Sequence, residues 1–444
     1  MHHLLFDYRM RPDDINVQQQ NYILLDLYKQ YIIHIGQEYL NNLKLYFLFP
    51  SSYNKNMIRF KLKKTKKIST QNKLNLSVQN KRRILKVDHR RQHTDFLFLF
   101  IVLIISIFGL IMVYDASVVE ASEAFGDRFH YLKFQAIYVI VGWILLFIVS
   151  RINYHIYRKW IKWLFIGNLI LLVLVLVPGI GLSIKGAKRW IDLGFTTYQP
   201  SETFKTILVI YLAKWVEKRR SMGQFFALIA FVLGLIILQP DLGTAIVLIT
   251  TSFAVYFVSG APVMQFALAS FSSFLIGLLL VFTSPYRRAR ITTFLNNSTD
   301  SLGSSYHVQQ ILLALGSGGL FGLGIGQSLQ KYRYLPEAMG DSIFAIIGEE
   351  VGFLGALLFI LLYVVILWKG FKIAQKASDI FGRLLAIGIV CWIGTQFCIN
   401  LASMVSLVPL TGVPLPLISY GGTSLIVTLV SIGILINISK QIES

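Results

Sequence analysis

Long apolar stretches alternate with short polar segments over most of the chain, from residue 96 to residue 440. A membrane-spanning helix needs about 20 mostly apolar residues, and stretches of about that length predict about ten such helices. The predicted helices cover residues 96–113, 134–149, 161–177, 203–216, 224–238, 242–259, 263–282, 341–368, 384–404 and 417–438. The pattern predicts an all-α fold, a polytopic membrane protein with a long extracytoplasmic loop, residues 284–340, between helices 7 and 8.

Residues 1–94 differ from the rest because they are polar, rich in Asn, Gln and Lys, and lack an apolar stretch of transmembrane length. We expect a basic, disordered cytoplasmic tail here and a transmembrane domain over residues 95–440. The basic residues also fit a surface that binds anionic lipid, or translated sequence upstream of a natural start near Lys86. No cleavable signal peptide precedes the first predicted helix, so that helix is expected to act as the insertion signal.

Composition agrees with a chain whose solvent is lipid, since 55% of the residues are hydrophobic and 14% are charged. The net charge of +20 does not indicate nucleic acid binding, because the basic residues gather in the tail and in loops beside apolar stretches. Basic loops alternate along the chain, and such loops remain cytoplasmic. Both termini are therefore predicted to be cytoplasmic. The two cysteines, Cys391 and Cys398, lie in one apolar run, which excludes a disulfide framework.

Several cations are predicted on the outer face, against the orientation rule: Lys188, Arg189, Arg287 and Arg290. An anionic ligand is the simplest reason to hold them there, because a guanidinium group matches phosphate oxygens. Nearby, Glu202 and Lys205 are three residues apart and share a helix face inside the membrane. They either neutralise each other as a buried ion pair or contact a substrate directly.

Two carboxylates, Glu337 and Asp341, stand at the entrance to a predicted membrane helix. Ionisable groups at that depth are costly and usually serve chemistry, transport or pairing. Asp341 either caps the helix or accepts a proton from a sugar hydroxyl in a water-filled cavity, and the two roles are compatible. Glu349 and Glu350, deeper in the same helix, need partners or protons, and at least one should face the bundle interior.

Three further segments carry unusual residues. Asp241, after Gln239 and Pro240, is expected to cap a helix rather than bind a ligand. The glycines of residues 316–326 lack the strand and the Lys-Ser/Thr ending of a P-loop, which predicts close helix packing or a bent loop. His307 has no partner at metal-ligand spacing, so we expect no metal held by protein side chains alone.

Residues 408–424 contain three prolines and a Gly pair, and they include Ser419 and Tyr420. Such a segment implies non-helical backbone at membrane depth, which is tolerated only where protein or a cavity covers it. It is either a kinked structural element or the lining for a lipid-linked substrate.

Six motifs occur in the order known from one family: Gly-Ala-Lys-Arg-Trp-Ile, Gln-Pro-Ser-Glu, Gln-Pro-Asp-Leu-Gly-Thr, Leu-Pro-Glu-Ala…Asp, Ile-Gly-Glu-Glu-Val-Gly and Pro-Leu-Ile-Ser-Tyr-Gly-Gly. From about Lys86 to Lys440 the chain resembles the SEDS family of shape, elongation, division and sporulation proteins, which contains FtsW, RodA and SpoVE. The wording of two motifs is closer to FtsW than to RodA.

The resemblance implies a peptidoglycan glycosyltransferase that polymerises lipid II on the outer face of the cytoplasmic membrane during cell division. The family's essential acid falls on Asp341, which implies a general base. The family commonly has His-Thr-Asp at this point and this chain has Met339-Gly340-Asp341, so no histidine is assigned a role there. A RodA-like elongation enzyme of the same chemistry, a lipid II flippase or transporter, and a non-catalytic scaffold are the alternatives.

On this hypothesis, cations hold the pyrophosphate that leaves with undecaprenol, and Glu202 positions Lys205. The residues expected to bind substrate are Lys188, Arg189, Glu202, Lys205, Arg287, Arg290, Glu337, Ser419 and Tyr420. No cofactor is assigned, although Mg²⁺ or Mn²⁺ is compatible as a helper. The resemblance also implies a class B penicillin-binding protein and other divisome proteins as partners, beside lipid II and membrane lipid.

Overall fold

The computed structural model describes residues 95–184, 187–194, 196–217, 222–282, 294, 304–332 and 334–442. The predictions for the N-terminal tail, Arg287 and Arg290 lie outside the described residues. Within them, ten helices match the ten predicted from hydropathy: α3 (Phe96–Phe125), α4 (His130–Val149), α5 (Tyr157–Leu174), α6 (Pro200–Val216), α7 (Met222–Leu238), α8 (Leu242–Val258), α9 (Val263–Phe282), α12 (Ile343–Lys376), α13 (Ile380–Met404) and α14 (Gly422–Lys440). The predicted all-α polytopic fold is confirmed.

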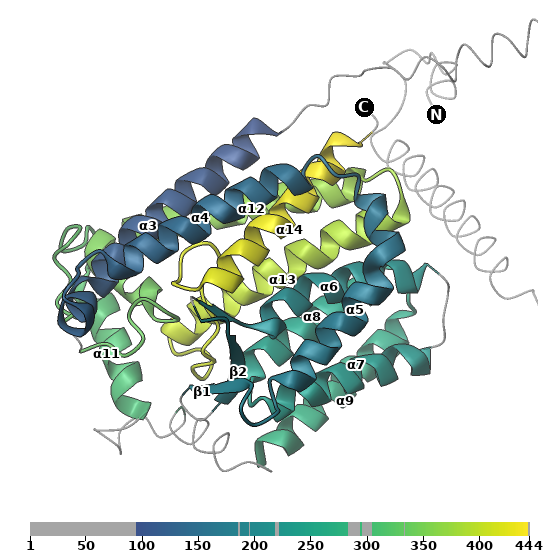
Figure 1. Cartoon of the computed structure of the whole chain (residues 1–444), viewed down its shortest axis with the longest axis horizontal. Coiled ribbons are helices and arrows are strands. Elements are labelled where there is room, and N and C mark those ends of the chain that lie inside the picture. The colour runs from purple at the N-terminus through teal and green to yellow at the C-terminus, as the bar shows by residue number, and fades with distance from the viewer. Residues whose placement is uncertain are drawn as a thin grey trace, which may run out of the picture. The chain divides into compact units, whose positions relative to one another are not determined.

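The helices pack side by side in one bundle (Figure 1). By length and composition, five of those in the described part of the chain are able to cross a membrane: α3, α4, α12, α13 and α14. α13 and α14 are the most buried of the five, and Trp392 of α13 is fully enclosed. α4 and α12 instead expose rows of large apolar side chains, as expected of helices whose outer surface meets lipid.

Three small elements in the polar connections were not predicted. A three-stranded antiparallel sheet in the order β1-β2-β3 comprises β1 (Gly181–Ile184), β2 (Ala187–Asp192) and β3 (Thr197–Tyr198). The helix α11 (Ser304–Ser317) lies in the long loop predicted for residues 284–340, and a short 3-10 helix, η1 (Tyr154–Ile156), follows α4. Strands of two to six residues are too short to produce a clear alternating pattern.

Several predicted helix ends were wrong, and three of them change where a polar or charged residue lies. α3 continues to Phe125 instead of ending at residue 113, because its Asp115 is buried beside Lys331 and need not meet water. α12 begins at Ile343 rather than at residue 341, and its N-cap is Ser342. α14 begins at Gly422, which leaves Ser419 and Tyr420 in the turn before it.

α12 was predicted as one continuous helix, yet its backbone is broken at Gly352, which has φ 69° and ψ −173°. The glycine-rich residues 318–324 fill the break. A Cβ on Gly322 would meet the Glu350 carbonyl oxygen at 2.1 Å, and one on Gly352 would meet the Gly322 nitrogen at 2.2 Å. The two backbones approach this closely only because both residues lack a side chain. The close-packing interpretation of the glycine series is therefore confirmed.

Candidate active site

A cavity of about 460 Å³ lies between β2, α6, α11, α13, the non-helical residues 408–421 and the start of α14. Six of the predicted site residues line it: Arg189, Glu202, Lys205, Glu337, Asp341 and Tyr420. Polar residues that were not predicted line it as well. Lys188 and Ser419 lie outside that lining. The structure thus gathers on one wall side chains that are more than 200 residues apart in the sequence.

Asp341 lies on the cavity wall in the turn before α12. The N-cap of α12 is Ser342, and Asp341 lies one residue before it. The Asp341 backbone carbonyl accepts a hydrogen bond of 2.8 Å from the Asn400 side-chain amide. This bond ties the turn to the end of α13.

The turn that carries Asp341 is held from several elements. The Ser419 hydroxyl donates to the Gly340 carbonyl at 2.6 Å, and the Tyr420 backbone N–H donates to the Met339 carbonyl at 2.8 Å. His307 of α11 contacts the Ser342 hydroxyl at 2.7 Å. Ser419 was predicted to bind substrate, but its contacts within the described residues are with backbone. It holds the residue next to the acid.

Glu337 begins the same turn and has a φ of 52°, in the left-handed region that non-glycine residues seldom adopt. Its carbonyl accepts hydrogen bonds from the Gly340 and Ser342 amides at 2.9 and 3.3 Å. This tight turn brings Glu337 and Asp341 to the lining of one cavity. Backbone strain of this kind is often found at functional sites.

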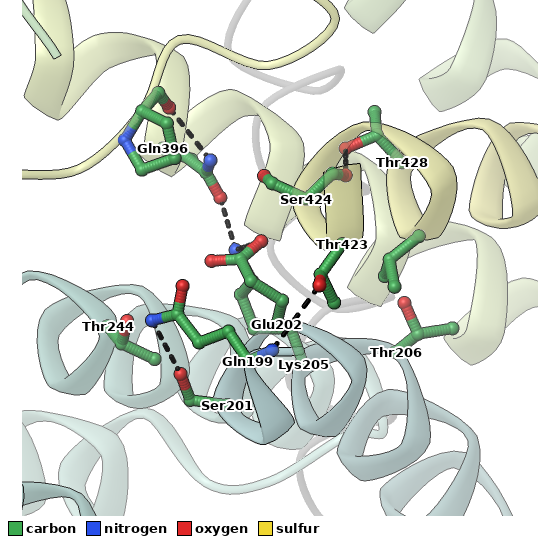
Figure 2. A network of polar contacts seen from close by, with 12 residues as sticks. Gln199, Ser201, Glu202, Lys205, Thr206, Thr244, Gln396, Thr423, Ser424 and Thr428 are labelled. Carbon is green, nitrogen blue, oxygen red and sulfur yellow. Dashed lines mark hydrogen bonds and ion pairs between the residues drawn. The ribbon is translucent and has the colours of Figure 1, made fainter. Parts of the chain in front are cut away.

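Glu202 and Lys205 form an ion pair of 2.8 Å, with side chains only 3% and 2% exposed, which confirms the ion-pair interpretation. Lys205 also donates to the Gln396 side-chain oxygen at 2.5 Å and lies 4.9 Å from the centre of the Trp392 ring. Figure 2 shows this network between α6 and α13. Both side chains also line the cavity, where a bound molecule would meet them, and both remain bound to these internal partners.

Arg189 of β2 reaches the turn between α7 and α8. Its Nε donates to the Gln239 carbonyl at 3.1 Å, and a terminal nitrogen donates to the Pro240 carbonyl. Another terminal nitrogen lies 3.8 Å from Asp241. Arg189 therefore supplies donors to the carbonyl end of α7, where helices leave such groups unsatisfied.

Asp241 caps α8, as predicted. Its carboxylate accepts hydrogen bonds from the Thr244 backbone N–H at 3.1 Å and from the Thr244 hydroxyl at 2.8 Å. Asp241 also lines the cavity beside Arg189. The cap fixes the α7–α8 turn and so fixes the support for that arginine.

The described part of the cavity lining carries four carboxylates, those of Glu202, Asp241, Glu337 and Asp341, against two cations, Arg189 and Lys205, an excess of two negative charges. A pyrophosphate would need further positive charge in such a cavity. No group of three or more His, Cys, Asp or Glu among the described residues is arranged to hold a metal ion.

Tyr420 lies beside the turn that carries Asp341. Burial, and then the neighbouring hydroxyls of Tyr138 and Tyr131, raise the pKa of Tyr420 above its ordinary value. Its phenol therefore stays neutral at physiological pH and is available as a hydrogen-bond donor.

Sequence reasoning missed the polar residues of α13. Gln396, Asn400 and Ser403 are spaced four and three apart in an otherwise apolar helix, so they share one face. All three are buried, and Gln396 and Ser403 line the cavity. A polar stripe in a predicted membrane helix was a sufficient signal, because polar groups there face the bundle interior or a cavity.

A second groove of about 490 Å³ lies between α4, α5, α6 and α14 and is lined mostly by apolar side chains, among them Leu164, Ile207 and Val430. Thr197, Gly422 and Thr423 line both this groove and the polar cavity. Gly422 packs against the Tyr138 ring so closely that an added Cβ would meet it at 2.8 Å. The two spaces therefore share one wall and differ in polarity.

The chain resembles known proteins in both sequence and fold. The model of the cell cycle protein family FtsW/RodA/SpoVE matches residues 95–444. Stage V sporulation protein E of Bacillus subtilis (strain 168) is 41% identical over 363 residues, which cover 79% of this chain and 98% of that protein. The probable peptidoglycan glycosyltransferase FtsW of Geobacter sp. (strain M18) is 39% identical over 358 residues, which cover 79% and 97%.

Solved structures agree. A chain from a structure described as structural coordination of polymerization and crosslinking by a peptidoglycan synthase complex has a TM-score of 0.65 and 29% identity, with 78% of this chain and 98% of that one covered. The rod shape determining protein RodA of Thermus thermophilus has a TM-score of 0.58 and 29% identity over 79% and 98%. The chain is a multi-pass membrane protein that belongs to the FtsW/RodA/SpoVE family of cell cycle proteins, known as the SEDS family.

Proposed function

We propose that this chain is a peptidoglycan glycosyltransferase that polymerises lipid II, with Asp341 as the general base. The observation that carries the proposal is the shared wall between two unlike spaces. A polar cavity that contains Asp341 meets an apolar groove between membrane helices at Thr197, Gly422 and Thr423. A substrate with a sugar head and a long isoprenoid tail has this same division of polarity.

In the reaction, the acceptor sugar hydroxyl attacks the anomeric carbon of the donor. The new bond joins the acceptor oxygen to that carbon, and the bond between the carbon and the pyrophosphate oxygen breaks, with its electron pair leaving on the pyrophosphate. Asp341 takes the hydroxyl proton. A positioned base of this kind contributes about 10²- to 10⁴-fold.

An aspartate with an ordinary pKa near 4 is a weak base. The proton is therefore transferred late, once the anomeric carbon has become electron-poor and the attacking oxygen acidic. Glu337 and the neutral Tyr420 are placed to hold sugar hydroxyls near Asp341, because all three line one cavity.

The leaving pyrophosphate needs positive charge. Arg189 and Lys205 line the cavity but are shared with internal partners, so we propose that Lys188, Arg287 and Arg290 supply further charge from the outer face. The carboxylates of the described lining would also suit Mg²⁺ or Mn²⁺ bound together with the pyrophosphate, and such an ion would neutralise charge on the leaving group. Glu202 positions Lys205 in this scheme.

We propose that the cavity lies at the outer face of the cytoplasmic membrane, with both termini in the cytoplasm. The alternating basic loops of the sequence support this orientation, because such loops tend to remain cytoplasmic. A class B penicillin-binding protein is the proposed partner, supported by the resemblance of this chain to a subunit of a peptidoglycan synthase complex. Cell division, rather than elongation, is proposed because the curated relatives named above are FtsW and a sporulation protein.

The test is to incubate the purified full-length protein with labelled lipid II and measure polymer. We expect Asp341→Asn to insert normally and to lose polymerisation by about 100-fold or more. Asp192→Asn is the matched control, an outer carboxylate at the end of β2 that does not line the cavity. Full polymerisation by Asp341→Asn would remove Asp341 from the chemistry, and an absence of polymer from the wild type would favour the flippase or scaffold alternatives.

A further inference from the structure

The break in α12 separates the turn that carries Asp341 from the part of the helix that spans the membrane. Residues 353–376 alone would extend about 36 Å at about 1.5 Å per residue, which is enough to cross the hydrocarbon core. Residues 343–351 are a separate short helical arm with Asp341 at its start. An intact helix would transmit the orientation of the long segment to this arm, but the conformation of Gly352 interrupts that path.

The missing helical hydrogen bonds are replaced by bonds to residues 318–324. In a continuous helix Phe353 N–H would donate to the Glu349 carbonyl and Leu354 N–H to the Glu350 carbonyl. Here Phe353 and Leu354 donate to the carbonyls of Gly319 and Leu320, at 2.9 and 3.1 Å. The freed carbonyls of Glu349 and Glu350 accept instead from the N–H groups of Leu323 and Gly324, both at 3.0 Å.

The side chains of the two glutamates also accept hydrogen bonds from the segment that precedes α12. Glu349 accepts from the Leu329 N–H at 3.1 Å and from the Ser328 hydroxyl, and Glu350 accepts from the Ser328 N–H at 3.1 Å. Both buried acids therefore have hydrogen-bond partners, the first of the two predicted alternatives of partners or protons. The arm is thus attached to residues 318–329 through main chain and side chain alike.

Lys331 fixes that loop to the rest of the bundle. Its ammonium group lies 2.8 Å from Asp115 of α3 and 3.7 Å from Glu350, and it donates to the Gly326 carbonyl at 2.6 Å. The side chains of Lys331 and Glu350 are 5% and 0% exposed. One cation therefore joins α3, the loop and the arm in a place with little solvent screening.

We propose that Lys331, with Asp115 and Glu350, is a positioning group for Asp341: it fixes the broken arm of α12 and so fixes the carboxylate at its start. The inference rests on the proposed role of Asp341. Lys331 does not line the cavity and touches no reacting atom. A general base that is misplaced by about 1 Å can lose about 100-fold in rate, so a support this far from the chemistry has a measurable effect.

The experiment measures steady-state polymerisation and amide hydrogen exchange on the purified full-length protein. We expect Lys331→Met to lower kcat by about 10- to 100-fold while KM for lipid II changes by less than about twofold. Exchange should accelerate at residues 343–351 and not at residues 360–376. Lys331→Arg, which keeps the charge, should restore most of the kcat.

Lys369→Met is the matched control, because Lys369 pairs with Asp95 at 2.7 Å and also joins α12 to α3, but beyond the break. It should leave kcat and exchange of the arm unchanged. Should Lys331→Met fold poorly, Ser328→Ala is the second variant. It removes the hydroxyl that donates to Glu349 and accepts from the Lys331 backbone N–H, leaves the Lys331 ion pairs in place, and should show the same pattern on a smaller scale.

An unchanged kcat despite faster exchange of the arm, or an equal loss in Lys369→Met, would overturn the positioning role. Asp341→Asn measured in parallel separates the two proposals. If that variant polymerises normally the proposed base is wrong, whereas the exchange results still report whether Lys331 holds the arm.

Discussion

The polar cavity and the apolar groove share three residues yet are built in opposite ways. The cavity is assembled from turns, strand and helix ends, and its charged groups are held by internal partners such as the Glu202–Lys205 pair. The groove is assembled mainly from the flanks of four helices and from β3, and its lining is mostly apolar. Substitutions in the cavity should therefore change chemistry or folding, whereas substitutions at the groove should change which lipids bind.

Asp341→Asn should have the largest effect, and it tests most directly whether the cavity and the groove have separate roles. Polymerisation should fall by about 100-fold or more, because the base is lost. Binding of lipid II should persist, since the groove is untouched. Binding measured by native mass spectrometry checks the second point, and loss of lipid binding in this variant would mean that the two spaces are not separable.

Lys205→Met should be the most destabilising cavity variant. It leaves Glu202 buried without its cation, and breaking a buried pair of this kind costs about 3–5 kcal/mol in the free energy of unfolding. Adding Glu202→Gln should recover most of the loss, because the stranded charge is then removed. Denaturant unfolding in detergent checks both variants, and equal stability of the single and double variants would contradict the argument.

Gly422→Val acts on the wall between the two spaces. Its side chain would displace the Tyr138 ring, and overpacking of this kind costs about 1–3 kcal/mol. KM for lipid II with its full isoprenoid chain should rise by about tenfold, and KM for a short-chain analogue should rise less. Gly421→Ala is the control, because an added Cβ there meets nothing closer than 3.9 Å. An equal rise with both lipids would place the effect in the cavity.

Arg189→Lys should have the smallest effect of the four. The charge beside the cavity remains, but the fork that reaches the Gln239 and Pro240 carbonyls is lost. One net hydrogen bond is worth about 1 kcal/mol, so KM for lipid II should rise by about fivefold with little change in kcat. An unchanged KM would indicate that Arg189 serves only the α7–α8 turn.

Much of the fold followed from local sequence. A stretch of about 20 apolar residues has few alternatives to a membrane helix, because only a helix satisfies its own backbone in lipid. The cap at Asp241 was predictable because it depends on residues only three positions apart. The close packing of the glycine series was predictable because it depends on the absence of a Cβ. Helix ends were less predictable where a distant partner, as Lys331 is for Asp115, allowed a charge to stay buried.

The sequence by itself determined which residues carry charge at membrane depth, that Asp341 stands at a helix entrance, and that Glu202 and Lys205 share a helix face. Only the tertiary structure decided that Asp341 lies on one cavity wall with Arg189 and Tyr420, and that α12 breaks at Gly352 to exchange its hydrogen bonds with residues 318–324. The physical reason is the separation along the chain over which each kind of interaction acts. Hydropathy and capping act between neighbours along the chain, whereas a shared wall and an exchanged hydrogen bond depend on segments that meet only when the bundle packs.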